Sequence, residues 1–427
     1  MEEIFINPEQ KDWHSILQRP VFDNRALEET VSTILAEVKL NGDDAVKRYS
    51  LHFDKAQLDE LLVSDGEILH AISMVSDELK AAIVIAQTNI EKFHAAQVQD
   101  SVKIETTKGV MCWRKSIAIQ RVGLYIPGGT APLFSTLLML GIPAVLAGCK
   151  DIIVCTPCDK SGQVNPVVLY VAQLIGIKSV YKIGGVQAIA AMAYGTQTVP
   201  QVYKIFGPGN QYVTCAKQLV NKDGVSIDMP AGPSEVAVYA DESSRPEFVA
   251  ADLLSQAEHG VDSQVLLVAS NQTLVDNIKL EIEQQLIKLP RKDIASAALL
   301  HSRFIVMEDA VAAFDLLNDY APEHLIIASD DALELSQKVV NAGSVFLGHY
   351  SPESVGDYAS GTNHTLPTNG YAKAYSGVSL DSFVKKVTYQ QVSKEGIQNI
   401  GRAVETMASA EGLDAHKNAV SRRMESE

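Results

Sequence analysis

Short apolar segments alternate with helix-like segments through the middle of this chain, and this alternation restricts its fold more than any other feature. A first series has strand-like segments at 122–126, 152–155, 179–183 and 202–206. A second series follows at 235–239, 264–269, 303–307 and 344–347. Strands that are joined through helices pair in parallel, and helices then cover both faces of the sheet. The alternation predicts an α/β protein with two doubly wound domains.

The segments outside these two series are less regular. Helical periodicity runs through 26–47, with an interruption at Asn41-Gly42, and again through 76–96, whereas 102–118 has an extended pattern. The final stretch is mostly helical by pattern and polar at its end, which suggests an appendage without its own core. We expect an N-terminal arm (1–25), a discontinuous first α/β domain (26–121 with 235–378), a second α/β domain (122–234) and a C-terminal tail (379–427).

Composition excludes several classes of protein. The 427 residues are too many for one ordinary core, and 46% hydrophobic with 21% charged residues is typical of a globular protein. A formal net charge of −16 argues against nucleic acid or an anionic membrane as the main partner. The start of the chain lacks the basic and apolar regions of a signal peptide, and no uninterrupted apolar run reaches membrane-spanning length. We expect a cytoplasmic protein.

The cysteines are few and odd in number, as is typical of a reducing compartment; they are Cys112, Cys149, Cys155, Cys158 and Cys215. Cys155 and Cys158 have the C-x-x-C spacing of redox and zinc motifs. No second C-x-x-C exists to complete a zinc site, and the pair directly follows an apolar strand. A structural position is the favoured interpretation of this pair.

Glycine-rich turns follow three of the predicted strands, at Gly128-Gly129, Gly184-Gly185 and Gly207-Pro208-Gly209. Backbone amides at the start of the next helix favour phosphate, so such turns are common ligand sites in open α/β sheets. None of the three forms the G-x-G-x-x-G fingerprint of a dinucleotide site. Nucleotide binding and simple tight turns both remain open.

Polar residues that could carry chemistry occur at four places. Gln256 and His259 lie three apart near the end of a predicted helix before Gly260, where they could share one face and supply half of a metal site. A chance pair is the alternative. Glu323 and His324 directly precede an apolar strand. They could act as two catalytic bases, or Glu323 could face solvent while His324 packs on the strand end.

The stretch 350–370 is long, polar and rich in glycine and proline, which is typical of functional loops. Asp357 and His364 are its best candidates for contact with a metal or a polar substrate. Glu411 and His416 near the C-terminus are further candidates, with a charged surface helix as the alternative.

Together these segments resemble the histidinol dehydrogenase family, over nearly the whole chain and without departure at a functional position. The motifs that carry the resemblance are Gly-Leu-Tyr-Ile-Pro-Gly-Gly from Gly123, Ile-Phe-Gly-Pro-Gly-Asn from Ile205, Asp-Met-Pro-Ala-Gly-Pro-Ser-Glu from Asp228, Asp-Leu-Leu-Ser-Gln-Ala-Glu-His-Gly from Asp252, Pro-Glu-His-Leu from Pro322, Gly-Asp-Tyr-Ala-Ser-Gly-Thr-Asn-His from Gly356 and Ala-His-Lys-Asn-Ala from Ala415.

The resemblance implies two incomplete Rossmann-like domains with small terminal segments that are exchanged in a homodimer. It implies one Zn²⁺ per subunit, held by Gln256, His259 and Asp357, with His416 reaching in from the partner subunit. The residues implied to contact the substrate L-histidinol are Ser234, Gln256, His259, His324, Asp357, His364, Glu411 and His416. The residues implied to contact NAD are Tyr125, Gln187 and Asn210.

The implied reaction is a four-electron oxidation of L-histidinol to L-histidine by way of the aldehyde, with two NAD used in turn. His324 would accept the hydroxyl proton, and Glu323 would activate the water that hydrates the aldehyde. Zinc would mainly fix the substrate. Three alternatives stay open: a relative that oxidises another substrate, a zinc hydrolase with the same ligands and Glu323 as base, and a catalytically silent protein of the same fold.

Overall fold

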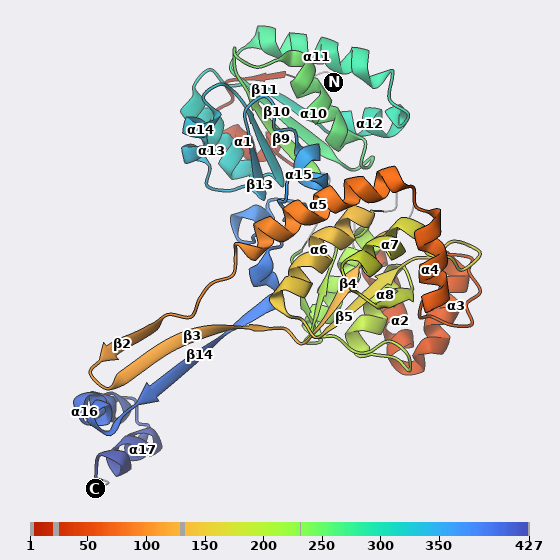
Figure 1. The fold of residues 1–427 in the computed structure, drawn as a ribbon. Coiled ribbons are helices and arrows are strands. Elements are labelled where there is room, and N and C mark those ends of the chain that lie inside the picture. The colour runs from red at the N-terminus through yellow and green to blue at the C-terminus, as the bar shows by residue number, and fades with distance from the viewer. Residues whose placement is uncertain (1–3, 20–24, 129–132, 231, 426–427) are drawn as a thin grey trace.

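The computed structural model describes residues 4–19, 25–128, 133–230 and 232–425. Two α/β lobes lie against each other, and a narrow arm leads away from them to the C-terminus (Figure 1). Each lobe is built on its own parallel sheet, so the predicted fold class is confirmed. Among the residues described, no helix is long and apolar enough to cross a membrane.

The first lobe contains a five-stranded parallel sheet in the order β6-β5-β4-β7-β8. Its strands are β4 (Arg121–Tyr125), β5 (Asp151–Thr156), β6 (Ser179–Lys182), β7 (Lys204–Phe206) and β8 (Ser226–Ile227). Its crossover helices are α6 (Phe134–Ala147), α7 (Pro166–Leu174), α8 (Gly185–Tyr194) and α9 (Gln211–Lys222). Strands β4 to β7 are the first series that the alternation predicts.

Four N-terminal helices also pack on this first lobe; they are α2 (Arg25–Asn41), α3 (Asp43–Phe53), α4 (Asp65–Met74) and α5 (Asp77–Ala95). Helix α2 packs against α8 and α9, α4 against α7, and α5 against α6. Val31, Ile34 and Val38 of α2 lie in one buried cluster with Ile189 of α8. This packing differs from the expected grouping of 26–121 with 235–378, because helical periodicity shows that a face is buried but not which sheet buries it.

The second lobe contains a six-stranded parallel sheet in the order β1-β11-β10-β9-β12-β13. Its strands are β1 (Ile4–Ile6), β9 (Glu235–Ala240), β10 (Gln264–Ala269), β11 (Arg303–Val306), β12 (His324–Ala328) and β13 (Ser344–Leu347). One face is covered by α10 (Pro246–Ala257), α11 (Gln272–Leu286) and α12 (Lys292–Leu299). The other is covered by α1 (Gln10–Ile16), α13 (Ala310–Tyr320) and α14 (Ala332–Leu335).

The N-terminal arm is therefore part of the second lobe rather than separate from it. Strand β1 extends the sheet by pairing in parallel with β11. Trp13 and Ile16 of α1 lie in the buried cluster on one face of that sheet. The N-terminal segment lacks a long periodic pattern, since its described residues form one short edge strand and one short helix.

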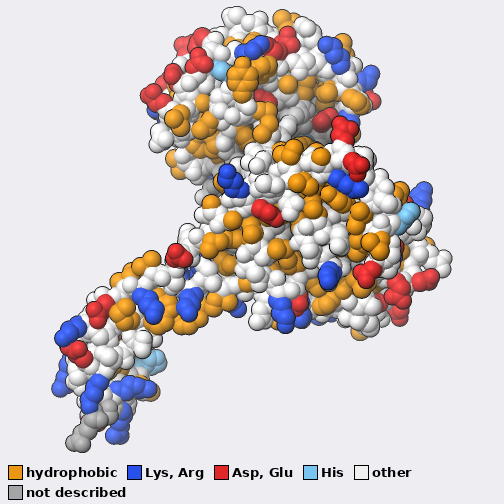
Figure 2. All heavy atoms as spheres, viewed as in Figure 1, with side chains coloured by type: hydrophobic (Ala, Val, Ile, Leu, Met, Phe, Trp, Pro, Cys, Tyr) orange, Lys and Arg blue, Asp and Glu red, His pale blue; other side chains and the backbone are white. Residues whose placement is uncertain are grey.

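The projecting arm consists of an antiparallel three-stranded ribbon in the order β14-β3-β2 and two helices at its tip (Figure 1). The strands are β2 (Lys103–Thr107), β3 (Val110–Ala118) and β14 (Val384–Val392), and the helices are α16 (Lys394–Ala410) and α17 (Asp414–Met424). Helix α17 buries no residue, in agreement with a tail that lacks its own core. Hydrophobic and basic side chains both line the visible face of the arm (Figure 2).

The stretch between β13 and β14 returns from the second lobe to the arm. It contains the short helix α15 (Glu353–Tyr358) and two 3-10 helices, η2 (Tyr371–Lys373) and η3 (Leu380–Phe383); another, η1 (Ser336–Lys338), precedes β13. Helix α15 lies near the boundary between the two lobes (Figure 1), and its Glu353 Oε2 is 3.9 Å from Nδ1 of His324, the first residue of β12. This placement brings the polar stretch 350–370 to the boundary between the lobes.

Candidate active site

His324 is the first residue of β12 and is held in one tautomer by the neighbouring strand. Its Nδ1 lies 3.1 Å from the carbonyl oxygen of Glu235, the first residue of β9. A carbonyl can only accept, so Nδ1 carries a proton and donates it. Nε2 is buried without a hydrogen-bond partner among the described groups, and it lies 3.7 Å from Asp357 Oδ1. Nε2 is thus the ring nitrogen that the protein leaves without a hydrogen bond.

Glu323 directly precedes β12, and its carboxylate is held by β9, the strand that also holds His324. Glu323 Oε2 accepts a hydrogen bond of 3.0 Å from the backbone N–H of Glu235 and lies 3.7 Å from His324 Nδ1. The backbone N–H and C=O of Glu235 thus hold both predicted catalytic bases, Glu323 and His324. Both side chains are buried, with 6% and 4% of their surface exposed.

Burial and mutual charge shift the pKa values of this cluster. Burial raises the pKa of Glu323 to about 8, against the lowering effect of His324. Burial by itself would lower the pKa of His324, but Glu323, Asp357 and Glu353 raise it to about 10. The surrounding carboxylates therefore stabilise the imidazolium that would form when His324 accepts a proton.

Glu353 belongs to this cluster, and the sequence analysis did not single it out. It is the first residue of α15, is 1% exposed, and accepts a hydrogen bond of 2.6 Å from Ser255 Oγ. The side-chain amide of Gln256 lies between Glu353 and β9; in the amide orientation that satisfies both neighbours, its nitrogen donates to Glu353 Oε1 at 3.0 Å and its oxygen accepts from the Glu235 N–H at 3.2 Å. The i, i+4 spacing of Glu353 and Asp357 is the signal that could have revealed it.

Asp357 lies close enough to His259 and His364 for their charges to shift its pKa. Helix α10 ends at Ala257, so His259 follows the helix rather than sharing its last turn with Gln256. Burial lowers the pKa of His259, partly offset by Asp357. Burial would raise the pKa of Asp357, but His324, His364 and His259 keep it below its ordinary value. His364 Nδ1 donates to the Asp357 carbonyl at 2.9 Å.

Two of the predicted site residues lie elsewhere in the same chain. Glu411 follows α16 and His416 lies in α17, both exposed at the tip of the arm, far from the lobes (Figure 1). Within the described part of the chain, no group of three His, Cys, Asp or Glu side chains is arranged to hold a metal ion. One chain brings His259 and Asp357 within reach of each other's charge and places Gln256 against Glu353, whereas His416 lies in α17 at the tip of the arm.

A cavity of about 270 Å³ lies at the boundary between the lobes. Five predicted residues line it, namely Asn210, Ser234, His259, Glu323 and His364. The opposite wall is the turn Gly207–Asn210 that follows β7. Asp228 fixes this turn by accepting a hydrogen bond of 2.8 Å from the Gly207 N–H, and Lys217 lies 2.5 Å from the same carboxylate.

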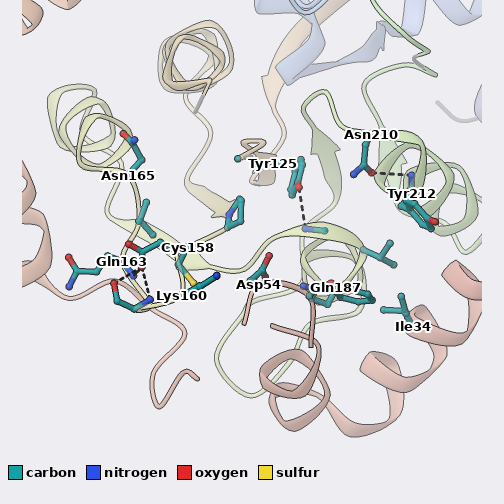
Figure 3. Close-up of a pocket in the computed structure, with 18 of the residues that line it drawn as sticks. Ile34, Asp54, Tyr125, Cys158, Lys160, Gln163, Asn165, Gln187, Asn210 and Tyr212 are labelled. Atoms are coloured by element: carbon teal, nitrogen blue, oxygen red, sulfur yellow. Dashed lines mark hydrogen bonds between the residues drawn. The ribbon is translucent and has the colours of Figure 1, made fainter. Parts of the chain in front are cut away.

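A larger cavity of about 1320 Å³ lies at the carboxyl ends of the strands of the first lobe (Figure 3). Tyr125, Gln187 and Asn210 all line it. The Tyr125 hydroxyl accepts a hydrogen bond of 3.1 Å from the Gly185 N–H, and Gln187 Oε1 is buried without a partner among the described groups. Asn210 is the one described residue that lines both cavities, so the two meet at its side chain.

The cysteines show no sign of redox chemistry. Burial raises the pKa of Cys155 far above its ordinary value and that of Cys158 to about 11. Thiols with raised pKa values are poor nucleophiles at neutral pH. All five cysteines are free.

Comparison with known proteins decides the family. The family model described as histidinol dehydrogenase matches residues 17–424. The chain belongs to the histidinol dehydrogenase family. It is therefore an oxidoreductase of amino-acid biosynthesis, and the family resemblance of the sequence is confirmed.

Full-length relatives of this family carry the same name. Histidinol dehydrogenase of Bacteroides fragilis is 59% identical over 418 residues, with 98% of each chain covered. The enzyme of Campylobacter jejuni is 49% identical, with 99% of each chain covered. The crystal structure of histidinol dehydrogenase from Elizabethkingia anophelis has a TM-score of 0.97 and 57% identity, and it covers 99% of this chain and 98% of that chain.

Proposed function

We propose that the protein oxidises L-histidinol to L-histidine through L-histidinaldehyde, with two NAD reduced in turn, as the last steps of histidine biosynthesis. The observation that carries the proposal is the free Nε2 of buried His324, whose Nδ1 is tied to a backbone carbonyl. The cavity that Glu323 and His259 line meets the larger cavity at Asn210. Family membership supplies the substrate and the reaction class.

In the first half-reaction, we propose, His324 Nε2 accepts the proton of the substrate hydroxyl while the carbinol carbon gives a hydride to NAD. The nearby carboxylates favour this step because they stabilise the resulting imidazolium. The products are the aldehyde, NADH and one proton on His324. The Glu235 carbonyl keeps the ring oriented throughout, since it binds the nitrogen that does not react.

In the second half-reaction, Glu323 takes a proton from water, and the hydroxide oxygen bonds to the aldehyde carbon, so that the former carbonyl oxygen carries the negative charge of an ionised hydrate. Burial raises the pKa of Glu323, which makes its ionised form a stronger base than an exposed carboxylate. A second NAD would take the hydride from this ionised hydrate, which leaves the carboxylic acid without a further proton transfer. No thiol is needed, in keeping with the raised pKa values of the buried cysteines.

The residues present fit a zinc ion. Gln256 offers an amide oxygen, and the shifted pKa values favour a neutral imidazole at His259 and an ionised carboxylate at Asp357, which are the ligand forms a metal requires. Zinc there would fix the substrate through its amine and imidazole and give some electrostatic help. His259→Asn should lower bound zinc, measured by elemental analysis, and retention of stoichiometric zinc would remove His259 from the ligand set.

The NAD residues Tyr125, Gln187 and Asn210 come to lie in one cavity large enough for a dinucleotide. The unpartnered Gln187 Oε1 is available to a hydroxyl or amide donor of such a ligand. Gly184 and Gly185 begin α8 at this cavity, where backbone amides favour a pyrophosphate. The five free cysteines suit the reducing cytoplasm, where we place the reaction.

The exposed Glu411 and His416 require a homodimer if they contact substrate, because their own chain holds them at the tip of the arm. We propose that the tip of each arm completes the site of the partner subunit, together with Ser234 and His364 of that site. The function is tested by supplying L-histidinol with zinc and NAD and identifying the product by chromatography. L-Histidine with NADH supports the proposal, whereas a product formed without NADH would favour a zinc hydrolase.

A further inference from the structure

Asp54 is a half-buried acidic residue that lines the larger cavity, and no step above uses it. It directly follows α3, and Figure 3 shows its side chain near Cys158 and Gln187. Its Oδ2 is buried and accepts no hydrogen bond from the described part of the protein. Its charge acts on the Tyr125 hydroxyl and the Cys158 thiol, which places the carboxylate between these two walls of the cavity.

The position of Asp54 is unfavourable for stability. Burial raises its pKa to about 6, and its Oδ2 has no hydrogen bond within the described part of the protein to offset the cost. It also caps the C-terminus of α3, where the helix dipole disfavours a negative charge. A polar group that costs stability and faces a cavity is a candidate for ligand binding.

A carboxylate can only accept hydrogen bonds and repels phosphate, so its partner must be a neutral donor. In a dinucleotide the ribose hydroxyls are such donors. Asn210 marks the end of the cavity that meets the substrate site, where the nicotinamide belongs. In the view of Figure 3, Asp54 is nearer to Cys158 and Lys160 than to Asn210. The ribose beside Asp54 is then that of the adenosine half.

The charges of the cavity agree with this assignment. Among its described lining residues, Lys160 is the only cation and no arginine is present. Asp159 also lines the cavity, but its Oδ1 is occupied by Ser161 Oγ at 2.6 Å and by the N–H of Gln163 at 3.0 Å. A 2′-phosphate would therefore meet the free carboxylate of Asp54 without an arginine to hold it.

We propose that Asp54 hydrogen-bonds the adenosine ribose hydroxyls of the dinucleotide and so selects NAD over NADP. The inference rests on the proposed function, because it requires a dinucleotide in this cavity. In Rossmann domains the acidic ribose contact follows the glycine-rich turn by about 20 residues. Here it comes from a helix that precedes the whole first sheet.

The test is the ratio of kcat/KM for NAD to kcat/KM for NADP in wild type, Asp54→Asn and Asp54→Ser. We expect the ratio to fall by about tenfold or more, since a hydrogen bond to a charged group is lost and the repulsion of the 2′-phosphate is removed. Asp159→Asn is the matched control, because it removes a charge from the same cavity but one whose hydrogen bonds are internal. Its ratio should stay within about twofold of wild type.

Calorimetric titration with 5′-AMP and with 2′,5′-ADP gives a second measurement that does not depend on turnover. Asp54→Asn should lose affinity for 5′-AMP relative to 2′,5′-ADP. An unchanged ratio in both experiments, or an equal shift in Asp159→Asn, would overturn the role of Asp54 while NAD use by wild type stands. A wild type that reduces neither dinucleotide would instead refute the proposed function.

The thermal midpoint without cofactor separates binding from a structural role. Asp54→Asn should melt at or above the wild-type temperature, because the buried unpartnered charge is removed. A clear fall of the midpoint in both Asp54 variants would show that the carboxylate supports the fold, and would overturn the assignment.

Discussion

One residue of β9, Glu235, organises the chemistry of the site through its main chain. Its N–H binds Glu323, its C=O binds His324, and its own buried carboxylate is held by Arg19 at 2.6 Å and 2.9 Å. The motif that contains Glu323 and His324 was visible in the sequence. The role of Glu235 was not visible, because any residue type could make these two backbone hydrogen bonds.

Glu323→Gln should impair the aldehyde half-reaction more than the alcohol half-reaction. Only the second half needs an activated water, so we expect about a hundredfold loss of L-histidinaldehyde oxidation and a smaller loss of L-histidinol oxidation to the aldehyde. Stopped-flow NADH formation from each substrate measures the two rates. Equal losses in both would count against the role of Glu323.

Asp54 should make stability depend on pH in a direction opposite to that of most carboxylates. Its folded pKa, about 6, lies above the ordinary value of 3.8 for an aspartate, so the folded state binds the proton more tightly. Wild type should therefore lose stability relative to Asp54→Asn as pH rises from 4 to 6, and the difference should be constant above about pH 7. Urea unfolding of both proteins across this range measures it, and a difference that shrinks as pH rises would contradict the assignment.

At the scale of elements, the strands were more predictable than their surroundings. Strands β4 to β7 and β9 to β13 follow from short apolar runs, since parallel strands buried on both faces read in this way. Strand β14, and the helices against which α2 to α5 pack, could not be predicted from such runs. Strand β14 is mostly exposed and polar, and it forms only because β3 pairs with it over nine residues.

The turn after β7 should tolerate no side chain at Gly207. Its φ is +124°, and a Cβ there would lie 2.1 Å from the Tyr125 carbonyl oxygen. We expect Gly207→Ala to cost about 3 kcal/mol of unfolding free energy, from backbone strain together with the clash. Gly224→Ala is the control, because φ is +96° but nothing lies within 4 Å. Its cost should be about 1 kcal/mol, and equal costs in denaturant unfolding would refute the clash.

At the scale of the whole molecule, the predicted site residues lie in two lobes and an arm. The substrate cavity lies at the amino ends of β9 and β12, and the larger cavity lies at the carboxyl ends of the first sheet. Sequence motifs predicted both sets of residues through the family resemblance. Composition could not place Glu411 and His416, because nothing in it shows that the arm holds them away from their own lobes.

Mixing two inactive variants tests whether the arms are shared. His259→Asn and His416→Asn should each be inactive alone, but a refolded mixture should recover about a quarter of wild-type activity, because half of the dimers are mixed and each has one intact site. Activity of the co-refolded pair measures this. No recovery, with mixed dimers shown to be present, would mean that His416 serves its own chain or no site at all.

The most direct test of the proposed chemistry is the number of NADH formed per L-histidinol consumed, measured with zinc and then with a chelator. Two hydride transfers from one site predict two NADH, and chelation should abolish both. A ratio of one would mean that the aldehyde leaves before Glu323 can activate water, and an absence of NADH would contradict the proposed reaction altogether.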